Sequence, residues 1–385
     1  MSDNHAVLNY LQAQQEPMTG LLQDLVLMET PSTDRDSQAQ IRQRLKNEFE
    51  EIDYRVNLLP GRSSGGHVYA SPRNRGNKQP AQLMIGHCDT VWPIGTLQSM
   101  PLVFEADTLR GPGVYDMKAG LVEMVYALRA IEHLGLKPAV APLCFINSDE
   151  EIGSRESTRY VRALAQRVDR CMVLEPSLGH SGKIKTARKG VGRFTVTVQG
   201  KAAHAGLDPG AGASAILELS HVIQKLFELN DPEQGTSVNV GVIDGGIRPN
   251  MVAPESRAVI DVRVQTQADA ERVEHAIHSL ETATPGVSLM IEGAIGRPPM
   301  ERTDENQRLW RVTQELAAGL DMELEQGTAG GGSDGNTTSL YTATIDGMGA
   351  VGDGAHASHE YIYVDLLPVR CALLTLLLLA PPLNP

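Results

Sequence analysis

The chain has 385 residues, 41% of them hydrophobic, which is enough to bury a full core and indicates two or three domains. The formal charge of −13 argues against nucleic acid and anionic membrane surfaces as partners. The N-terminal residues lack the basic and apolar regions of a signal peptide, and the apolar run 371–380 is about half of the ~20 residues that span a bilayer. The four cysteines show no CxxC spacing, which favours reduced thiols. We therefore expect a cytoplasmic protein without a membrane segment.

Apolar runs alternate with helical periodicity through the first half of the chain. The runs 81–86, 140–147 and 171–174 are typical of strands, and each is followed by polar or turn-forming residues. Residues 116–135 carry apolar side chains on one helical face and end at a glycine, which predicts a helix. This βα alternation predicts an α/β domain with a mixed, largely parallel sheet flanked by helices.

The pattern changes from Val191 onward. The predicted order is strand, helix, strand, strand, helix, strand, at 191–200, 211–229, 236–246, 256–264, 268–283 and 287–291. This order is the split βαβ arrangement of ferredoxin-like domains. We expect residues 190–297 to form an inserted small domain. Residues 1–189 and 298–385 would form the larger, discontinuous domain, because the tail again offers a helix and a sheet-like stretch.

Polar side chains with metal-binding chemistry stand where the predicted strands end. Because open α/β sheets carry ligands at the carboxyl ends of their strands, we expect these side chains to share one site. Each fragment alone has an ordinary explanation, such as a helix cap or a solvated strand end. Their joint placement after successive strands favours a functional site, made of His87, Asp89, Asp116, Glu150, Glu151, Glu175 and His356.

Histidine nitrogen and carboxylate oxygen are ligands that zinc accepts, and hydrolytic two-metal sites hold ions ~3.5–4 Å apart. If Asp116 bridges two ions, His87 and Glu175 can complete one position, and Glu151 and His356 the other. This assignment leaves two acidic residues unligated. Of these, Glu150 could act as a general base on the attacking water, and Asp89 could orient the ring of His87.

Seven segments extend this hypothesis to a known family: GHCDTV, GPGVYDMKAG, NSDEEIGS, LEPS, GKAAHAG, GGGSDGN and GAHASHEYIYVD. In their order and spacing the chain resembles, over nearly its whole length, the dinuclear zinc hydrolases. These include glutamate carboxypeptidase, acetylornithine deacetylase, succinyl-diaminopimelate desuccinylase and aminoacylase. The resemblance implies two Zn²⁺ ions per subunit, with Co²⁺ or Mn²⁺ as alternatives. It also implies the ligands His87, Asp116, Glu151, Glu175 and His356, with Glu150 as base and Asp89 as the orienting residue.

The resemblance has further implications. It implies a homodimer formed through the inserted domain, in which His204 of GKAAHAG stabilises the developing oxyanion in the neighbouring subunit's site. Asn250 and Arg263 match positions that contact a substrate carboxylate, a role that suits the guanidinium fork. Chemistry alone accepts either His356 or His359 as ligand; the family pattern His-x-x-x-Glu-Tyr selects His356, with Glu360 as its glutamate. A cis peptide after Asp116 is also implied.

These expectations predict a metallohydrolase that cleaves an amide bond beside a free carboxylate, in a peptide or a small molecule. The segments GHCDTVWPIGT and GPGVYDMKAG resemble glutamate carboxypeptidase most, so release of a C-terminal glutamate-like residue is the first hypothesis. Deacylation of an N-acyl amino acid is the alternative.

Two other classes of protein compete with the metallohydrolase. Residues 331–335 match the G-x-S-x-G nucleophile elbow around Ser333, and Asp353 and His356 follow in the chain order of a serine hydrolase. No convincing strand precedes this motif and no strong helix follows it, which argues against that hypothesis. A non-catalytic metal-binding protein on the same fold is the other competitor, and the presence of Glu150 argues against it.

Overall fold

The computed structural model describes residues 3–76 and 78–383. The chain divides into two compact units, and each is described here by itself. The larger unit consists of Met1–Thr186, Arg302–Thr328 and Ser333–Pro385, and the smaller unit of Ala187–Glu301 and Ala329–Gly332. The smaller unit therefore takes in a short glycine-rich segment that the sequence prediction assigned to the larger domain.

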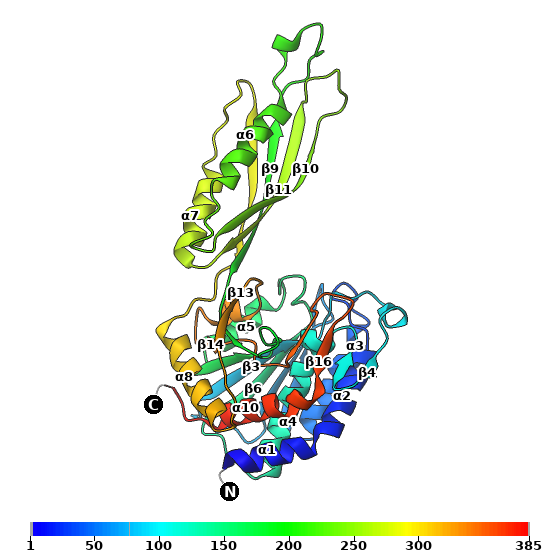
Figure 1. Ribbon diagram of the computed structural model, residues 1–385, viewed down its shortest axis with the longest axis vertical. Coiled ribbons are helices and arrows are strands. Elements are labelled where there is room, and N and C mark those ends of the chain that lie inside the picture. The colour runs from blue at the N-terminus through cyan, green and yellow to red at the C-terminus, as the bar shows by residue number, and fades with distance from the viewer. Residues whose placement is uncertain (1–2, 77, 384–385) are drawn as a thin grey trace. The chain divides into compact units, whose positions relative to one another are not determined.

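A six-stranded sheet forms the centre of the larger unit (Figure 1). Four strands pair in parallel, and at one edge β2 runs antiparallel to both of its neighbours, β1 and β6. Every residue of the two central strands is buried, as expected for parallel strands with helices on both faces. The mixed, largely parallel sheet is thus confirmed, in the order β1 (Tyr54–Leu59), β2 (His67–Pro72), β6 (Ala141–Asn147), β3 (Ala81–His87), β7 (Arg170–Val173), β14 (Ala343–Ile345).

Helices cover both faces of this sheet. One face packs against a large cluster built from α1 (Asp3–Ala13), α2 (Gln15–Leu27), α3 (Gln38–Glu50), α4 (Ala119–His133), α8 (Asp304–Ala318) and α10 (Leu367–Leu379). The other face packs against α5 (Thr158–Ala165), and the short α9 (Gly335–Thr338) lies beside α5 and β14. The apolar run near the C-terminus is α10, a buried core helix. In the described part of the chain, no helix has the length and apolar character needed to cross a membrane.

A second, four-stranded sheet lies in the larger unit and was not predicted. Its strands are very short, with the order β15 (Gly352–Asp353), β16 (Tyr361–Tyr363), β5 (Thr108–Arg110), β4 (Val103–Glu105). Pairing of β16 with β5 brings the loop after residue 353 next to the segment that leads into α4. A further two-stranded sheet pairs β8 (Ile184–Arg188) with β13 (Gln326–Ala329).

The smaller unit has the predicted split βαβ order. Its four strands form an antiparallel sheet, and α6 and α7 pack on one face of that sheet (Figure 1). Alternate residues of β11 are buried, as expected for a sheet with a single covered face. The order is β9 (Gly190–Gln199), α6 (Ala215–Phe227), β10 (Ser237–Gly245), β11 (Glu255–Val264), α7 (Gln267–His278), β12 (Ser288–Arg297).

The helices of the smaller unit are shorter than predicted, for local reasons. Helix α6 begins at Ala215 rather than residue 211, because Ser214 caps it by accepting a hydrogen bond from the backbone N–H of Leu217. Helix α7 ends at His278. Beyond it the backbone N–H groups of Ala283 and Thr284 donate to the buried carboxylate of Glu218 instead of to helical carbonyls.

Candidate metal centre

His87 is the last residue of β3, and its ring is buried at the tip of the sheet. The Nδ1 atom lies 2.9 Å from the main-chain oxygen of Asp89, which leaves Nε2 directed away from the strand. That atom lies 3.2 Å from Oδ1 of Asp116 and 3.5 Å from Oε1 of Glu175, which follows β7. Two carboxylates from separate segments thus face one imidazole nitrogen.

Asp116 lies between two histidines. It stands in a distorted helical turn, Val114–Lys118, that leads into α4, and the peptide bond after it is cis as the resemblance implied. While Oδ1 faces His87, Oδ2 lies 3.4 Å from Nε2 of His356. That same nitrogen lies 3.0 Å from Oε2 of Glu151. His359, the alternative to His356, is exposed.

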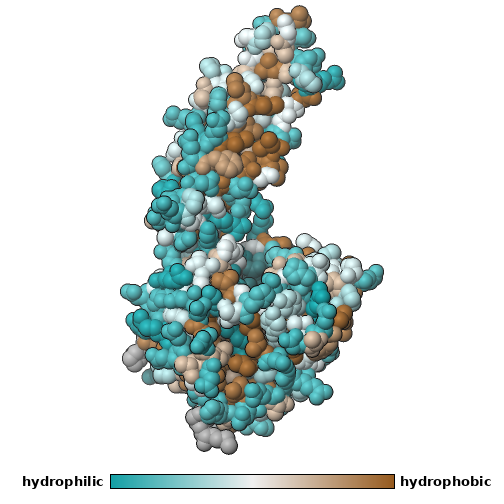
Figure 2. Space-filling model, in the orientation of Figure 1, coloured by the Kyte–Doolittle hydropathy of each residue, from teal (hydrophilic) through white to brown (hydrophobic). Residues whose placement is uncertain are grey.

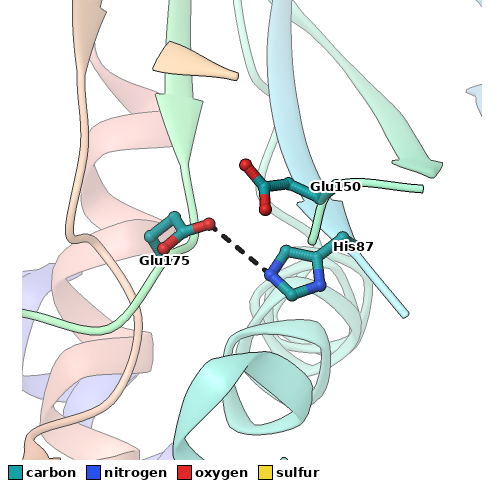
Figure 3. Close-up of side chains that lie close together, drawn as sticks. All are labelled: His87, Glu150 and Glu175. Atoms are coloured by element: carbon teal, nitrogen blue, oxygen red, sulfur yellow. Dashed lines mark ion pairs between the residues drawn. The ribbon is translucent and has the colours of Figure 1, made fainter. Parts of the chain in front are cut away.

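The structure therefore brings the predicted ligands and Glu150 together from distant parts of the sequence. His87, Glu150 and Glu175 offer ligand atoms within 4.8 Å of one another, and so do His87, Asp116 and Glu151. Figure 3 shows the first three side chains turned towards a common space, with the ion pair between His87 and Glu175 dashed. Both sets combine imidazole nitrogen with carboxylate oxygen, the donors that zinc accepts.

The electrostatics of the cluster favour cations. Burial lowers the pKa of His87, but the carboxylates of Asp116, Asp89 and Glu175 outweigh it and raise that pKa well above its usual value. Hydrogen bonds to Asp116 and Glu151 raise the pKa of His356 to about 10. Both pKa shifts arise because carboxylates outnumber histidines in the cluster, which leaves it with an excess of negative charge. In addition, Oε1 of Glu151 is buried without a hydrogen-bond partner among the described residues, as expected of an atom that ligates a cation.

Asp89 links His87 to the segment that carries Glu150 and Glu151. Its carboxylate accepts hydrogen bonds from the backbone N–H groups of Glu150 (3.3 Å) and Glu151 (3.2 Å) and from the hydroxyl of Ser32 (2.6 Å). The carboxylate oxygen lies 3.5 Å from Nδ1 of His87, farther than the main-chain oxygen. Ser32 was not predicted, since a serine in a loop has no distinguishing sequence pattern.

Glu360 and Trp92 also lie at the site, and their contacts were not predicted from the sequence. Glu360 is fully buried and accepts hydrogen bonds from the backbone N–H of Asp116 and the indole N–H of Trp92. Burial raises the pKa of Glu360 to about 7. The only signal in the sequence was its fixed spacing of four residues after His356.

His204 and Asn250 lie in exposed loops of the smaller unit. The backbone N–H groups of Gly206 and Leu207 donate to Nδ1 of His204 at 3.1 Å each, so the neutral ring carries its proton on Nε2. The main-chain oxygen of Asn250 accepts a hydrogen bond from Ala205 at 3.0 Å. The two predicted residues therefore stand on adjoining segments.

Arg263 lies near the end of β11 and is already paired. Its Nε donates to Oδ2 of Asp261 at 2.8 Å and its Nη2 to Oδ1 at 3.2 Å, in a two-point contact. A substrate carboxylate would have to share this guanidinium with Asp261 or displace it.

Ser333 does not have the environment of a catalytic serine. It is fully buried, its hydroxyl donates to the carboxylate of Asp346, and it accepts a hydrogen bond from the backbone N–H of Gly335. A nucleophile elbow instead exposes its serine above the sheet, beside a histidine base. His356 faces Asp116 and Glu151, so the serine-hydrolase alternative is wrong.

The fold and this donor set define a metallohydrolase acting on peptide or amide bonds, and comparisons with known proteins agree. The chain is 25% identical to carboxypeptidase G2 of Pseudomonas sp. (strain RS-16) over 361 residues, covering 91% of this chain and 85% of that protein. It is 30% identical to succinyl-diaminopimelate desuccinylase of Acinetobacter baylyi over 370 residues, covering 90% and 94%. Residues 186–283 match the peptidase dimerisation domain of the M20 family.

A solved structure shares the fold. A dinuclear metal-binding peptidase of the M20 family from Bacillus subtilis superposes with a TM-score of 0.71 at 14% identity, covering 95% of this chain and 98% of that one. The chain belongs to the M20 metallopeptidase family.

Proposed function

We propose that this protein is a two-zinc carboxypeptidase that releases a C-terminal glutamate or a similar amino acid. The observation that carries the proposal is the position of Asp116, whose two oxygens face two different histidines at 3.2 and 3.4 Å. A carboxylate in that position can bridge two ions. His87 and Glu175 would then complete one metal position, and Glu151 and His356 the other, with Co²⁺ or Mn²⁺ as alternatives to zinc.

Bound zinc would supply Lewis-acid polarisation of the scissile carbonyl and of the attacking water. Glu150 supplies the proton transfer in this proposal: it takes a proton from the water and returns it to the leaving amine. Its carboxylate lies within 4.8 Å of the ligand atoms of His87 and Glu175. Its backbone N–H is held by Asp89, which fixes where the side chain starts.

His204 would stabilise the oxyanion that forms on the carbonyl, since its proton lies on Nε2 and can be donated. His204 adjoins the Glu255 end of β11, through the bond from Val252 to Ala203, whereas Arg263 lies at the other end. Arg263 lies eight positions after Glu255 along the strand, or about 26 Å away. A small substrate cannot span that distance. His204 and Arg263 can therefore act on the same substrate only if they come from different subunits.

A homodimer through the smaller unit would satisfy this requirement. In that unit β10 is an edge strand, and Figure 2 shows apolar surface over α6 and β10. Exposed apolar side chains on these elements include Ile216, Leu217, Val242 and Ile243, and the exposed Ile247 lies just after β10. A second copy of the chain would cover this surface and pair the edge strand. Each site would then combine Arg263 of its own subunit with His204 and Asn250 of the partner subunit.

The guanidinium of Arg263 would bind the free carboxylate of the substrate, as the arginine fork does in other proteins. Carboxypeptidase G2 is among the relatives that match most of this chain, which supports release of a C-terminal residue. The glutamate-like preference rests on the resemblance of GHCDTVWPIGT and GPGVYDMKAG to glutamate carboxypeptidase. Deacylation of an N-acyl amino acid is the second candidate, since succinyl-diaminopimelate desuccinylase matches at 30% identity. Both reactions release an amine next to a carboxylate.

A substrate panel separates the two candidates. Purified protein would be loaded with zinc, its metal content measured, and its hydrolysis of peptidyl and N-acyl glutamates compared with that of acetylornithine and succinyl-diaminopimelate. We expect the glutamates to give the highest kcat/KM, and activity to vanish with a chelator and return with zinc. Preference for the succinyl or acetyl substrates would favour the deacylase. Full activity in metal-free protein would contradict both.

We further propose that the enzyme works in the cytoplasm. Its four cysteines are free thiols buried in the core. Buried reduced thiols suit a reducing compartment, where disulfides do not persist. Fractionation of the native host would test this location, and recovery of the protein outside the cytoplasm would contradict it.

A further inference from the structure

Glu360 is a buried carboxylate beside the candidate centre that takes no part in the proposed chemistry. It lies four residues after His356 and directly precedes β16. Four N–H groups donate to it. Oε1 receives those of Tyr115 (2.9 Å) and Asp116 (3.0 Å), and Oε2 receives those of Gly113 (2.9 Å) and the Trp92 indole (3.0 Å).

This one side chain connects three segments that carry predicted ligands. Trp92 stands five residues after His87, residues 113–116 end in Asp116, and Glu360 itself follows His356. The backbone strengthens the connection, because the N–H of Gly111 donates to the main-chain oxygen of Glu360 at 3.2 Å. Residues that are distant in sequence are therefore joined through a single carboxylate, in addition to the pairing of β16 with β5.

Residues 113–116 need such an acceptor because their backbone is not regular. Asp116 has φ −110° and ψ 95°, outside the helical region, and Gly113 has φ 72°. The N–H groups here lie at the start of a helix, where no intrahelical acceptor is available. Buried N–H groups without an acceptor are costly, and the Glu360 carboxylate accepts three of them.

We propose that Glu360 is a positioning residue: it holds the Asp116 segment against the His356 loop so that the two oxygens of Asp116 stay directed at the two histidines. This inference rests on the proposed metal centre. Glu360 touches neither substrate nor metal in it, and acts only through Asp116 and His356. Residues that support metal ligands in this way typically contribute about 10- to 100-fold to metal affinity.

The test is zinc binding by the full-length protein, measured by competition with a chromophoric chelator. Glu360→Gln keeps the shape of the side chain but replaces one oxygen with an amino group, which repels the N–H donors on that side. We expect zinc affinity to fall by about 10- to 100-fold. We also expect kcat to recover at saturating zinc, with KM unchanged, because the substrate contacts are intact.

Glu218→Gln is a matched control. Glu218 is also fully buried and also accepts backbone N–H groups, those of Ala283 and Thr284, but it lies in the smaller unit. We expect its zinc affinity to equal that of the wild type. A loss as large as that of Glu360→Gln would mean that general destabilisation is measured, and would overturn the inference.

Trp92→Phe removes only the indole donor and keeps the carboxylate, so it serves if the glutamine variant does not fold. We expect a smaller loss of zinc affinity in the same direction. If Glu360→Gln folds and binds zinc with wild-type affinity, the positioning role is overturned but the proposed metal centre is not. If Glu360→Gln does not fold, wild-type affinity in Trp92→Phe has the same consequence. Failure of the wild type itself to bind zinc would instead overturn the proposed function, and this inference with it.

Discussion

The two units of this protein hold their predicted functional residues in opposite ways. In the larger unit the residues are mostly buried, face one another at 3.0–3.5 Å, and are fixed by hydrogen bonds from neighbouring segments. Only His356, with 52% of its side chain exposed, stands at the surface. In the smaller unit His204 and Asn250 are exposed, and Arg263 is paired with Asp261.

This difference suggests that the two units have different roles in the site. The larger unit organises its site by folding alone, because burial and hydrogen bonds hold each side chain in place. In the smaller unit two of the three predicted residues are exposed, and in the proposed function they act only when a substrate and a partner subunit are present. Substitutions in the larger unit should therefore affect chemistry or metal binding, whereas those in the smaller unit should leave the metal in place.

The largest effect is expected from Glu150→Gln. The amide cannot accept a proton from the attacking water, so kcat should fall by ~10²–10⁴ while zinc content persists. Steady-state kinetics and metal analysis on the same preparation measure the two quantities. Glu105→Gln, at an exposed glutamate paired with Arg110, is the control and should keep full activity. An unchanged kcat in the Glu150 variant would remove that residue from the mechanism.

A slightly smaller effect is expected from His204→Ala in the smaller unit. Loss of an oxyanion donor should lower kcat by ~10²–10³ with zinc content unchanged. Mixed dimers sharpen the comparison between the units. If His204 acts in the partner's site, a dimer of one Glu150→Gln and one His204→Ala subunit contains one complete site, and co-expression should restore activity. Co-expressed subunits that stay inactive would show that His204 acts in its own subunit.

Arg263→Ala should act on binding. Hydrogen bonds to charged groups contribute about 1.5–3 kcal/mol, so KM should rise by about 10- to 100-fold with kcat less affected. Arg263→Lys should recover only part of this loss, because an ammonium cannot make the two-point contact. Asp261→Asn weakens the competing pair and should lower KM slightly. KM values equal to that of the wild type in all three variants would show that Arg263 does not bind substrate and only pairs with Asp261.

The smallest effects are expected from two carboxylates that hold loops, one in each unit. Burial raises the pKa of Glu156, but N–H groups of residues 62–64 outweigh it and lower that pKa from 4.5 to about 2. Backbone N–H groups likewise lower the pKa of Glu218 against the effect of burial. A lowered folded-state pKa contributes stability that is present above pH 4.5 and is lost as the pH falls through the folded value.

Glu156→Gln and Glu218→Gln should each reduce the free energy of unfolding at pH 7 by about 1–3 kcal/mol. The difference from wild type should shrink as the pH falls, for Glu156 between about 4.5 and 2. Chemical denaturation across that range, followed by circular dichroism, measures it. A loss of stability that does not depend on pH would show that the charge of these carboxylates is not what holds the loops.

Much of this architecture follows from local sequence patterns. Long buried strands such as β3 and β6 are recognisable because apolar and small residues dominate them, and α4 because its apolar face repeats with the helical period. Side chains that follow such strands converge because parallel strands end at one edge of the sheet. The candidate ligands were therefore predictable as a group, and the resemblance to a family assigned them individual parts.

Other features depended on contacts between distant segments. The sheet of β4, β5, β15 and β16 has strands of two or three residues, too short to show any periodicity. Neither the pairing of Asp89 with Ser32 nor that of Glu360 with Trp92 leaves a trace in the chain, since the partners are 57 and 268 residues apart. The sequence by itself determined the long helices and strands and which residues can bind metal. Only the tertiary structure decided what holds those residues in place, because hydrogen bonds between distant segments depend on how the elements pack.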